Sequence, residues 1–176
     1  MEEKLKKALQ AMDKEDYRTS FEIFQPLAEQ GHAKTQFYLG FLYRIGQGVN
    51  QDFQKAYHWY SLAAEQGYAE AQYKVGLMHF KGQVVAKDYQ KAFQWYSLAA
   101  EQGDVMAQSN LGHLFVEGKT GKEDFIQGLK WFNIAGANED GEGHKNREAV
   151  EKLMTPDQIT EAQRLAREWT EEHGKN

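Results

Sequence analysis

Hydrophobic side chains between residues 53 and 64 recur at spacings of three and four residues, and the positions between them are largely polar. This spacing places the apolar side chains on one side of an α-helix, because positions three and four apart share a helical face. Asp52 precedes the pattern and Gly67 follows it, as is typical of a helix start and of the residue just past a helix end. The pattern predicts an amphipathic helix whose apolar side holds Phe53, Ala56, Trp59, Tyr60, Ala63 and Ala64.

The end of this helix occurs twice in the chain. The segment 59–67 is identical to the segment 95–103, at a spacing of 36 residues, and aligning 32–67 with 68–103 gives 19 identities. A period between about 20 and 50 residues marks a supersecondary unit that buries its apolar face by stacking on copies of itself. We therefore predict an all-α solenoid in which each unit contributes two antiparallel helices joined by a glycine-containing turn.

The repeat register divides the chain into units of a single repeat domain, 1–176. We expect an N-terminal capping unit at 1–31, repeats at 32–67, 68–103 and 104–139, and C-terminal capping helices at 140–176. After the third repeat come a polar loop, Asn138–His144, and a short helix near 146–153. Thr155 and Gln158 then have the spacing of a capping box, which predicts the start of a last helix.

The first helix of each unit has two distinct faces. One arc hardly changes between copies and contains Gln36, Gln72 and Gln108, together with a mid-helix glycine in each copy. Glycine in a helix interior costs about 1 kcal/mol relative to alanine, so its recurrence indicates a close approach between helices on this packing face. The opposite arc varies between copies and holds Phe37, Phe41, Arg44, Tyr73, Leu77, Phe80, Ser109 and His113.

Composition and charge limit the partners that the chain can have. The formal net charge of -5 disfavours nucleic acid and anionic membrane surfaces, both of which attract basic proteins. No apolar run approaches the roughly 18 residues of a membrane-spanning helix, so we expect no membrane insertion. The charged start, 1–7, is unlike a signal peptide. We expect a cytoplasmic protein if Met1 is the native start, and a periplasmic or secreted one if the chain is a trimmed mature form.

The sequence offers no recognisable catalytic or cofactor motif. It contains no cysteine, and its six histidines lack metal-ligand spacing. Gly46-Gln47-Gly48 follows a helix and has no accompanying lysine, which favours a structural turn over a phosphate loop. We predict no enzymatic activity, no metal and no cofactor. His79 is expected to be a hydrogen-bonded core residue, and Trp59, Trp95 and Trp131 are expected in the core.

The chain resembles the Sel1-like repeat, a 36-residue relative of the tetratricopeptide repeat. The resemblance covers about 16–137. It rests on Leu39-Gly40, Tyr43, Gly46-Gln47-Gly48-Val49, Asp52, Lys55-Ala56, Trp59-Tyr60 and Ala63-Ala64-Glu65-Gln66-Gly67. It implies a right-handed α-solenoid that acts as an adaptor in protein complexes, and bacterial relatives are linked to signalling, envelope functions and host contact. The sequence departs from the pattern at Val84, where the second turn glycine is expected, and at Thr120 and Gly121.

By analogy with tetratricopeptide repeats, the variable arc of the first helices is the concave binding surface. We predict a non-catalytic scaffold that binds a protein segment or peptide there, with apolar anchors and with Arg44 facing a carboxylate. Three alternatives stay open. The aromatic residues of the arc could be additional core. The groove could bind a small molecule, such as a cell-wall fragment, or act as an enzyme with Arg44 and His113 as polar anchors. The expected monomer could also associate end to end.

Overall fold

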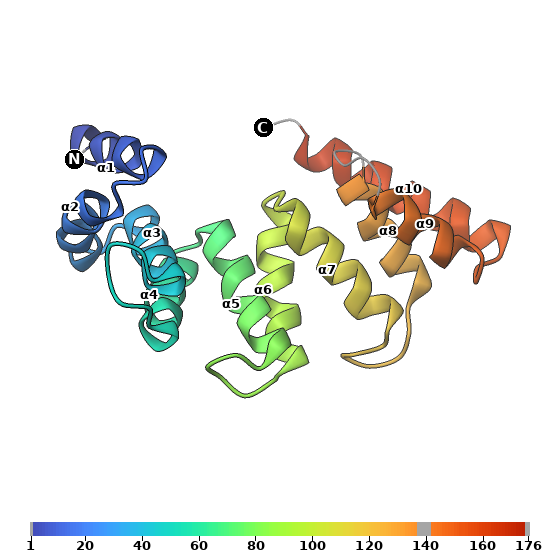
Figure 1. Cartoon of the computed structure of the whole chain (residues 1–176). Coiled ribbons are helices and arrows are strands. Elements are labelled where there is room, and N and C mark those ends of the chain that lie inside the picture. The colour runs from blue at the N-terminus through green and yellow to red at the C-terminus, as the bar shows by residue number, and fades with distance from the viewer. Residues whose placement is uncertain (1, 137–141, 175–176) are drawn as a thin grey trace. The chain divides into compact units, whose positions relative to one another are not determined.

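The computed structural model describes residues 2–136 and 142–174, and all regular secondary structure in these ranges is helical (Figure 1). The chain divides into two compact units, Met1–Lys87 (unit 1) and Asp88–Asn176 (unit 2). Unit 1 contains α1 (Glu2–Asp13), α2 (Tyr17–Glu29), α3 (Ala33–Ile45), α4 (Phe53–Glu65) and α5 (Ala69–Lys81). Unit 2 contains α6 (Tyr89–Glu101), α7 (Val105–Val116), α8 (Phe125–Gly136), α9 (Glu142–Glu151) and α10 (Pro156–His173).

Helices that are neighbours in sequence pack against each other within each unit. In unit 1, α1 packs on α2, α2 on α3, α3 on α4, and α4 on α5. In unit 2, α6 packs on α7 and α7 on α8, while both α9 and α10 pack on α8. The predicted all-α solenoid of stacked helix pairs is confirmed, and unit 2 ends in two additional helices that cover α8.

The helix boundaries follow the predicted capping residues. The carboxylates of Asp52, Asp88 and Asp124 each accept a hydrogen bond of 2.9 Å from the backbone N–H three positions ahead. The glycines at 31, 67 and 103 follow helix ends and have φ angles of +92°, +88° and +89°. A side chain resists this left-handed conformation whereas glycine adopts it freely, so these positions end the second helix of each unit as expected.

A buried glutamine in each leading helix ties that helix to the one before it. Gln36, Gln72 and Gln108 are 2–4% exposed. Their side-chain Nε2 atoms donate to the carbonyl oxygens of Ala28, Ala64 and Ala100 at 3.2, 3.2 and 3.0 Å. Each of these carbonyls also accepts the N–H of the glycine three residues later. Both lone pairs of the carbonyl are therefore used, at a helix end where backbone acceptors lack helical partners.

Tyrosine, and not tryptophan, is the central aromatic residue in the first two copies of the second helix. Tyr60 and Tyr96 have 0% exposure, whereas Trp59 and Trp95 are half-buried. The prediction that Trp59 and Trp95 are core residues is thus wrong. The fully buried alanines of these helices lie on the same side as the tyrosine, and the tryptophan lies at the edge of that face. Trp131 is 4% exposed and is a core residue as predicted.

The glycine in the middle of a leading helix accommodates an aromatic ring of the following helix. A Cβ atom added at Gly40 would lie 2.9 Å from the Tyr60 ring, and one added at Gly112 would lie 2.7 Å from the Phe132 ring. Both distances are shorter than real Cβ contacts. The close approach that the sequence predicts is confirmed for these two positions, and its purpose is to seat the ring.

The turns between the two helices of a unit differ between copies. Gly48 has a φ of +74°, and Val84 at the equivalent position has a φ of +71°. A β-branched residue is strained in this region, whereas glycine is not. Gly48 also lies against the preceding helix pair, because a Cβ there would be 2.3 Å from the carbonyl oxygen of Tyr17. The second copy keeps the turn conformation despite the unfavourable residue.

The C-terminal helices close the core of unit 2. The predicted polar loop Asn138–His144 lies partly outside the described residues, and the short helix after it begins earlier than expected, at Glu142. The capping box is confirmed, with Thr155 N donating to Gln158 Oε1 at 2.9 Å and Gln158 N donating to Thr155 Oγ1 at 3.3 Å. The core under these helices contains Leu129, Phe132, Val150 and Ala162.

Candidate functional site

The predicted binding residues of unit 1 lie on α3 and α5. Phe37, Phe41, Leu77 and Phe80 are half-buried, and Tyr73 is buried, with 8% exposure. The expectation that Tyr73 offers an uncovered ring is therefore wrong. Tyr73 lies three positions before Gly76 and so shares a face with the buried glycine, at the border of the packing arc.

Phe37 and Phe41 take part in aromatic and cation–π contacts. The Phe37 ring lies 5.2–5.6 Å from the rings of Tyr38, Tyr60 and Tyr68. The guanidinium carbon of Arg44 lies 5.2 Å from the centre of the Phe41 ring, and Phe41 packs against the N-terminal core. Phe37 and Phe41 are therefore partly packed against other rings of unit 1 and partly exposed to solvent.

A pocket of about 270 Å³ lies between α3, α4 and α5 of unit 1. Three basic side chains line it, Arg44, Lys74 and Lys81, and no acidic side chain does. The apolar part of the lining includes Leu77 and Phe53, and Phe53 is 48% exposed. The remaining lining residues are Tyr60, Met78 and Gln83. Two of the predicted site residues, Arg44 and Leu77, thus meet in one pocket.

Two polar groups at this pocket are buried and lie close enough to interact with each other. They are Nε of Arg44 and the hydroxyl of Tyr60. Burial raises the pKa of Tyr60 to about 12, although the nearby guanidinium of Arg44 acts in the opposite direction. An oxygen-rich group entering the pocket would accept hydrogen bonds from the cationic side chains that line it.

The sequence contained a signal for this pocket that the repeat comparison missed. Lys74, Leu77, Met78 and Lys81 follow the i, i+3, i+4, i+7 spacing of a single helical stripe. The alignment of copies directed attention to the neighbouring stripe of Tyr73, Leu77 and Phe80. The contribution of Tyr60 and Phe53, which belong to the preceding helix α4, could not be found from α5 alone.

The predicted residues of unit 2 lie on α7 and are half-buried. The His113 ring lies 4.9 Å from the Phe132 ring, and its Nε2 atom lies 3.3 Å from Nδ2 of Asn146 in α9. His113 is thus engaged by the C-terminal helices. Ser109 is half-buried on α7 and stays a predicted site residue.

His79 is 5% exposed, and its Nε2 atom lies 3.3 Å from the Tyr57 hydroxyl. The prediction of a hydrogen-bonded core histidine is confirmed. Across residues 2–136 and 142–174, no three His, Cys, Asp or Glu side chains are grouped in a way that could hold a metal ion. Every described helix is too short or too polar to cross a lipid bilayer.

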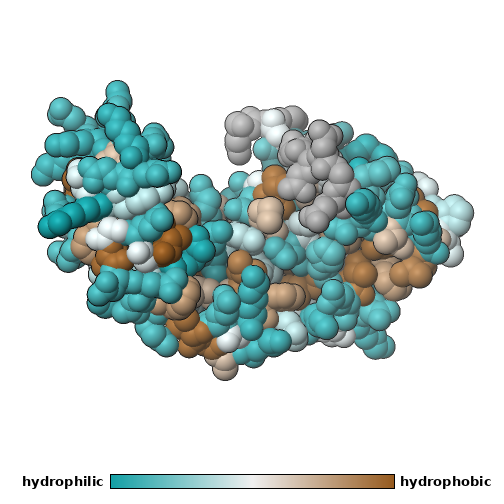
Figure 2. Space-filling view, in the orientation of Figure 1, coloured by the Kyte–Doolittle hydropathy of each residue, from teal (hydrophilic) through white to brown (hydrophobic). Residues whose placement is uncertain are grey.

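The surface view in Figure 2 is mostly hydrophilic, with smaller hydrophobic areas between the polar side chains. The most exposed large apolar side chains of the described chain are Phe53, Leu98, Met106 and Leu153. Phe53 is the one among them that lies beside basic residues in a pocket. Unit 1 therefore offers an apolar anchor site and a cationic site in the same place.

Comparison with known protein families identifies the repeat. Sel1 repeats are matched at residues 10–32, 33–68, 69–104 and 105–140, which together cover most of the chain. The chain belongs to the Sel1 repeat family. Sel1 repeat proteins are generally protein-interaction scaffolds, and the solenoid of this one has the architecture of that class.

Two solved bacterial structures resemble this Sel1 repeat protein. A Sel1 repeat protein from Oxalobacter formigenes has 26% identity and a TM-score of 0.76, over 94% of this chain and 69% of that one. A protective antigen of uropathogenic Escherichia coli that displays an SLR fold has 30% identity and a TM-score of 0.58. That comparison covers 88% of this chain and 41% of the antigen. No curated protein matches the chain.

Proposed function

We propose that this Sel1 repeat protein is a non-catalytic scaffold that binds a protein segment through the Arg44–Lys74–Lys81 pocket of unit 1. The observation that carries the proposal is the combination of three cationic side chains with an exposed apolar side chain, Phe53, in one pocket. Family membership supports the general role of protein binding. The pocket supports the finer statement, namely a segment with an acidic residue close to an apolar one.

The energetics of the pocket favour such a segment. A carboxylate would accept charge-assisted hydrogen bonds from the Arg44 guanidinium and from the ammonium groups of Lys74 and Lys81, the three cationic groups that line the pocket. Charge-assisted hydrogen bonds to arginine are stronger than neutral ones, and arginine and tyrosine are enriched among the residues that dominate interface energies. The volume of about 270 Å³ suits one side chain and is small for a complete drug-sized ligand.

Selection from a random peptide library displayed on phage tests the proposal. We expect the wild-type chain to enrich peptides with Asp or Glu next to an aromatic or aliphatic residue. The double variant Lys74→Glu/Lys81→Glu should lose this preference, because it replaces two positive charges at the pocket by negative ones. Enriched peptides should bind more weakly as salt is added, since exposed charge pairs are screened.

Lys7→Glu is a suitable control, because Lys7 is exposed on α1 and does not line the pocket. The Lys7→Glu variant should still bind the peptides that the wild-type chain enriches. Circular dichroism should show that all variants retain helical content and melting temperature. Enrichment without acidic residues, or equal loss in the Lys7 variant, would contradict the proposed site.

A further inference from the structure

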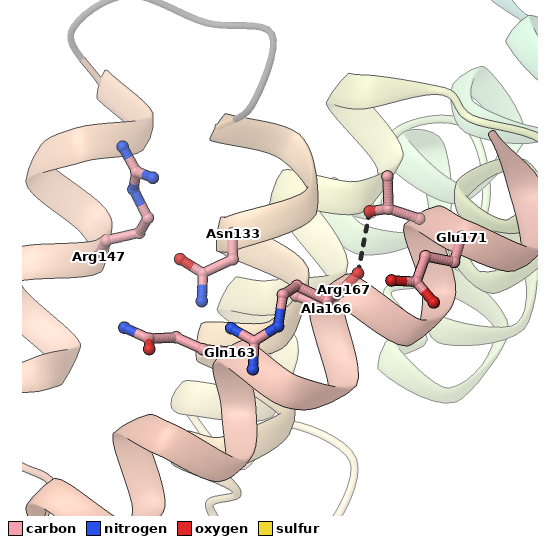
Figure 3. Close-up of a pocket in the computed structure, with 7 residues that line it drawn as sticks. Asn133, Arg147, Gln163, Ala166, Arg167 and Glu171 are labelled. Carbon is pink, nitrogen blue, oxygen red and sulfur yellow. Dashed lines mark hydrogen bonds between the residues drawn. The ribbon is translucent and has the colours of Figure 1, made fainter.

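A second pocket lies within unit 2, where the two helices after the last repeat meet α8. Its volume is about 450 Å³. Asn133 of α8 lies between Arg147 of α9 on one side and Gln163 and Arg167 of α10 on the other (Figure 3). Ala166, Thr170 and Glu171 of α10 complete the lining. None of these residues belongs to the pocket of unit 1.

Two hydrogen-bond donors at this pocket are buried and lack partners in the described part of the chain. They are Nε of Arg147 and Nδ2 of Asn133. The Thr170 hydroxyl already donates to the Ala166 carbonyl at 2.9 Å, as the dashed line in Figure 3 shows. The two groups without partners, Arg147 Nε and Asn133 Nδ2, are both hydrogen-bond donors. Because buried donors without acceptors are unfavourable, the pocket is complementary to a ligand that brings acceptor oxygens.

The charge of the lining selects among such ligands. Arg147 and Arg167 carry two positive charges and Glu171 carries one negative charge, which leaves one positive charge, while the whole chain has a formal charge of -5. A singly charged group balances this lining, whereas a phosphate dianion would exceed it. A guanidinium group also matches the planar, two-oxygen geometry of a carboxylate.

The Arg147 guanidinium lies beside the glycine at the end of α8. A Cβ atom added at Gly136 would lie 3.3 Å from Cζ and 3.4 Å from Nε of Arg147, so the absence of a side chain at this position leaves room for the guanidinium at the pocket.

We propose that the pocket between α8, α9 and α10 binds a carboxylate group, with Arg147, Arg167 and Asn133 as hydrogen-bond donors. The carboxylate can belong to a small organic acid or to the C-terminus of a peptide, because both present the same planar group. This site is independent of the one proposed in unit 1.

Nuclear magnetic resonance titration of the full chain tests the site directly. The probes are the monocarboxylate propionate, the tripeptide Gly-Gly-Leu with a free C-terminus, and the same tripeptide with an amidated C-terminus. We expect saturable shifts of the Arg147 Nε–H and Asn133 side-chain NH₂ signals with at least one free carboxylate and none with the amide. Tighter binding of propionate assigns the site to small acids, and tighter binding of the free tripeptide assigns it to chain ends.

Arginine variants separate this site from a general charge effect. Arg147→Gln and Arg167→Gln should each weaken binding about tenfold or more, the change expected when one charged hydrogen-bond partner is lost. Arg164→Gln removes the same charge from α10, but Arg164 pairs with Glu161 and Glu168 away from the pocket and should leave binding unchanged.

Three results would overturn the proposal. They are the absence of saturable shifts with both free carboxylates in the wild-type chain, equal weakening in the Arg164 variant, and binding of inorganic phosphate as tight as that of the carboxylates. The first result does not depend on how well the variants fold. The titration and the arginine variants both concern unit 2. A negative result in either therefore does not contradict the peptide-binding site proposed in unit 1.

Discussion

The second helix of the last repeat, α8 in unit 2, buries its tryptophan, whereas the second helix of the repeat in unit 1, α4, leaves its tryptophan partly exposed, as does α6. Trp59 in α4 is half-buried, whereas Trp131 at the equivalent position of α8 is 4% exposed. The Trp131 ring lies 5.8 Å from the ring of Trp169, which α10 places over it. The repeat pattern thus sets which helix carries a residue, and the elements that cover the helix decide whether that residue is core or surface.

The largest expected effect tests this difference in cover. Trp131→Ala should lower the free energy of unfolding by about 3–5 kcal/mol, because it empties a packed site. Trp59→Ala should cost less than half as much, since its side chain is already partly in water. Urea denaturation followed by circular dichroism measures both. Equal losses would show that burial does not separate the two positions.

The second comparison concerns the ring seated under the mid-helix glycine, which is Tyr60 in unit 1 and Phe132 at the equivalent position of unit 2. The folded state holds the Tyr60 proton until a pKa of about 12, whereas an unfolded tyrosine loses it near 10. The contribution of Tyr60 to the free energy of unfolding is therefore fully present below pH 10. It falls as the pH rises towards 12, because the unfolded chain then binds fewer protons than the folded chain.

Tyr60→Phe should remove this part of the pH dependence, at most about 2–3 kcal/mol at the upper end. The measurement is the urea midpoint of both proteins at several pH values between 9 and 12. Tyr68, whose pKa is also raised to about 12, remains in both and provides the common background. Identical slopes for the two proteins would contradict the assignment to Tyr60.

A smaller effect is expected at Val84, which occupies the turn position where the preceding copy has Gly48. Val84→Gly should raise the free energy of unfolding by about 1 kcal/mol, since it relieves the strain of a φ of +71°. Part of the gain is offset by the greater freedom of glycine in the unfolded chain. Thermal denaturation measures it, with Val85→Gly as a control that should not stabilise, because Val85 is absent from the positive-φ residues.

The smallest effect concerns the contact that joins α7 to α9 in unit 2. Asn146→Ala removes the partner of His113 Nε2 and should cost about 0.5–1.5 kcal/mol. Hydrogen exchange of the backbone amides of α9 should become faster, while that of α1 to α5 should not change. Unchanged exchange in α9 would indicate that other contacts hold this helix in place.

Much of the fold could be predicted because it depends on local signals. The capping aspartates Asp52, Asp88 and Asp124 and the glycines after the helix ends mark boundaries through their own backbone chemistry. The buried glutamines were assigned to the packing face from their recurrence alone. Their hydrogen-bond acceptors were not predicted, because a helix wheel does not show which carbonyl of the preceding helix lies opposite.

The site was less predictable for a physical reason. Arg44 and Leu77 were found, but Tyr73 was expected to be uncovered and is buried. The exposure of a side chain at the border of an arc depends on the rotation between neighbouring helices, which the alignment of copies does not contain. The pocket of α8, α9 and α10 also lay beyond prediction, since two of its three helices fall outside the repeat.

The glutamine contacts have a consequence for how such a chain can change its length. The copies at 32–67 and 68–103 each carry a glutamine that binds the preceding copy and an alanine carbonyl that accepts from the glutamine of the next copy. Duplication of a whole 36-residue segment would therefore supply matching ends at both borders without any further substitution. A gene encoding this architecture can gain or lose copies in single steps and still encode a chain whose internal joints are complete.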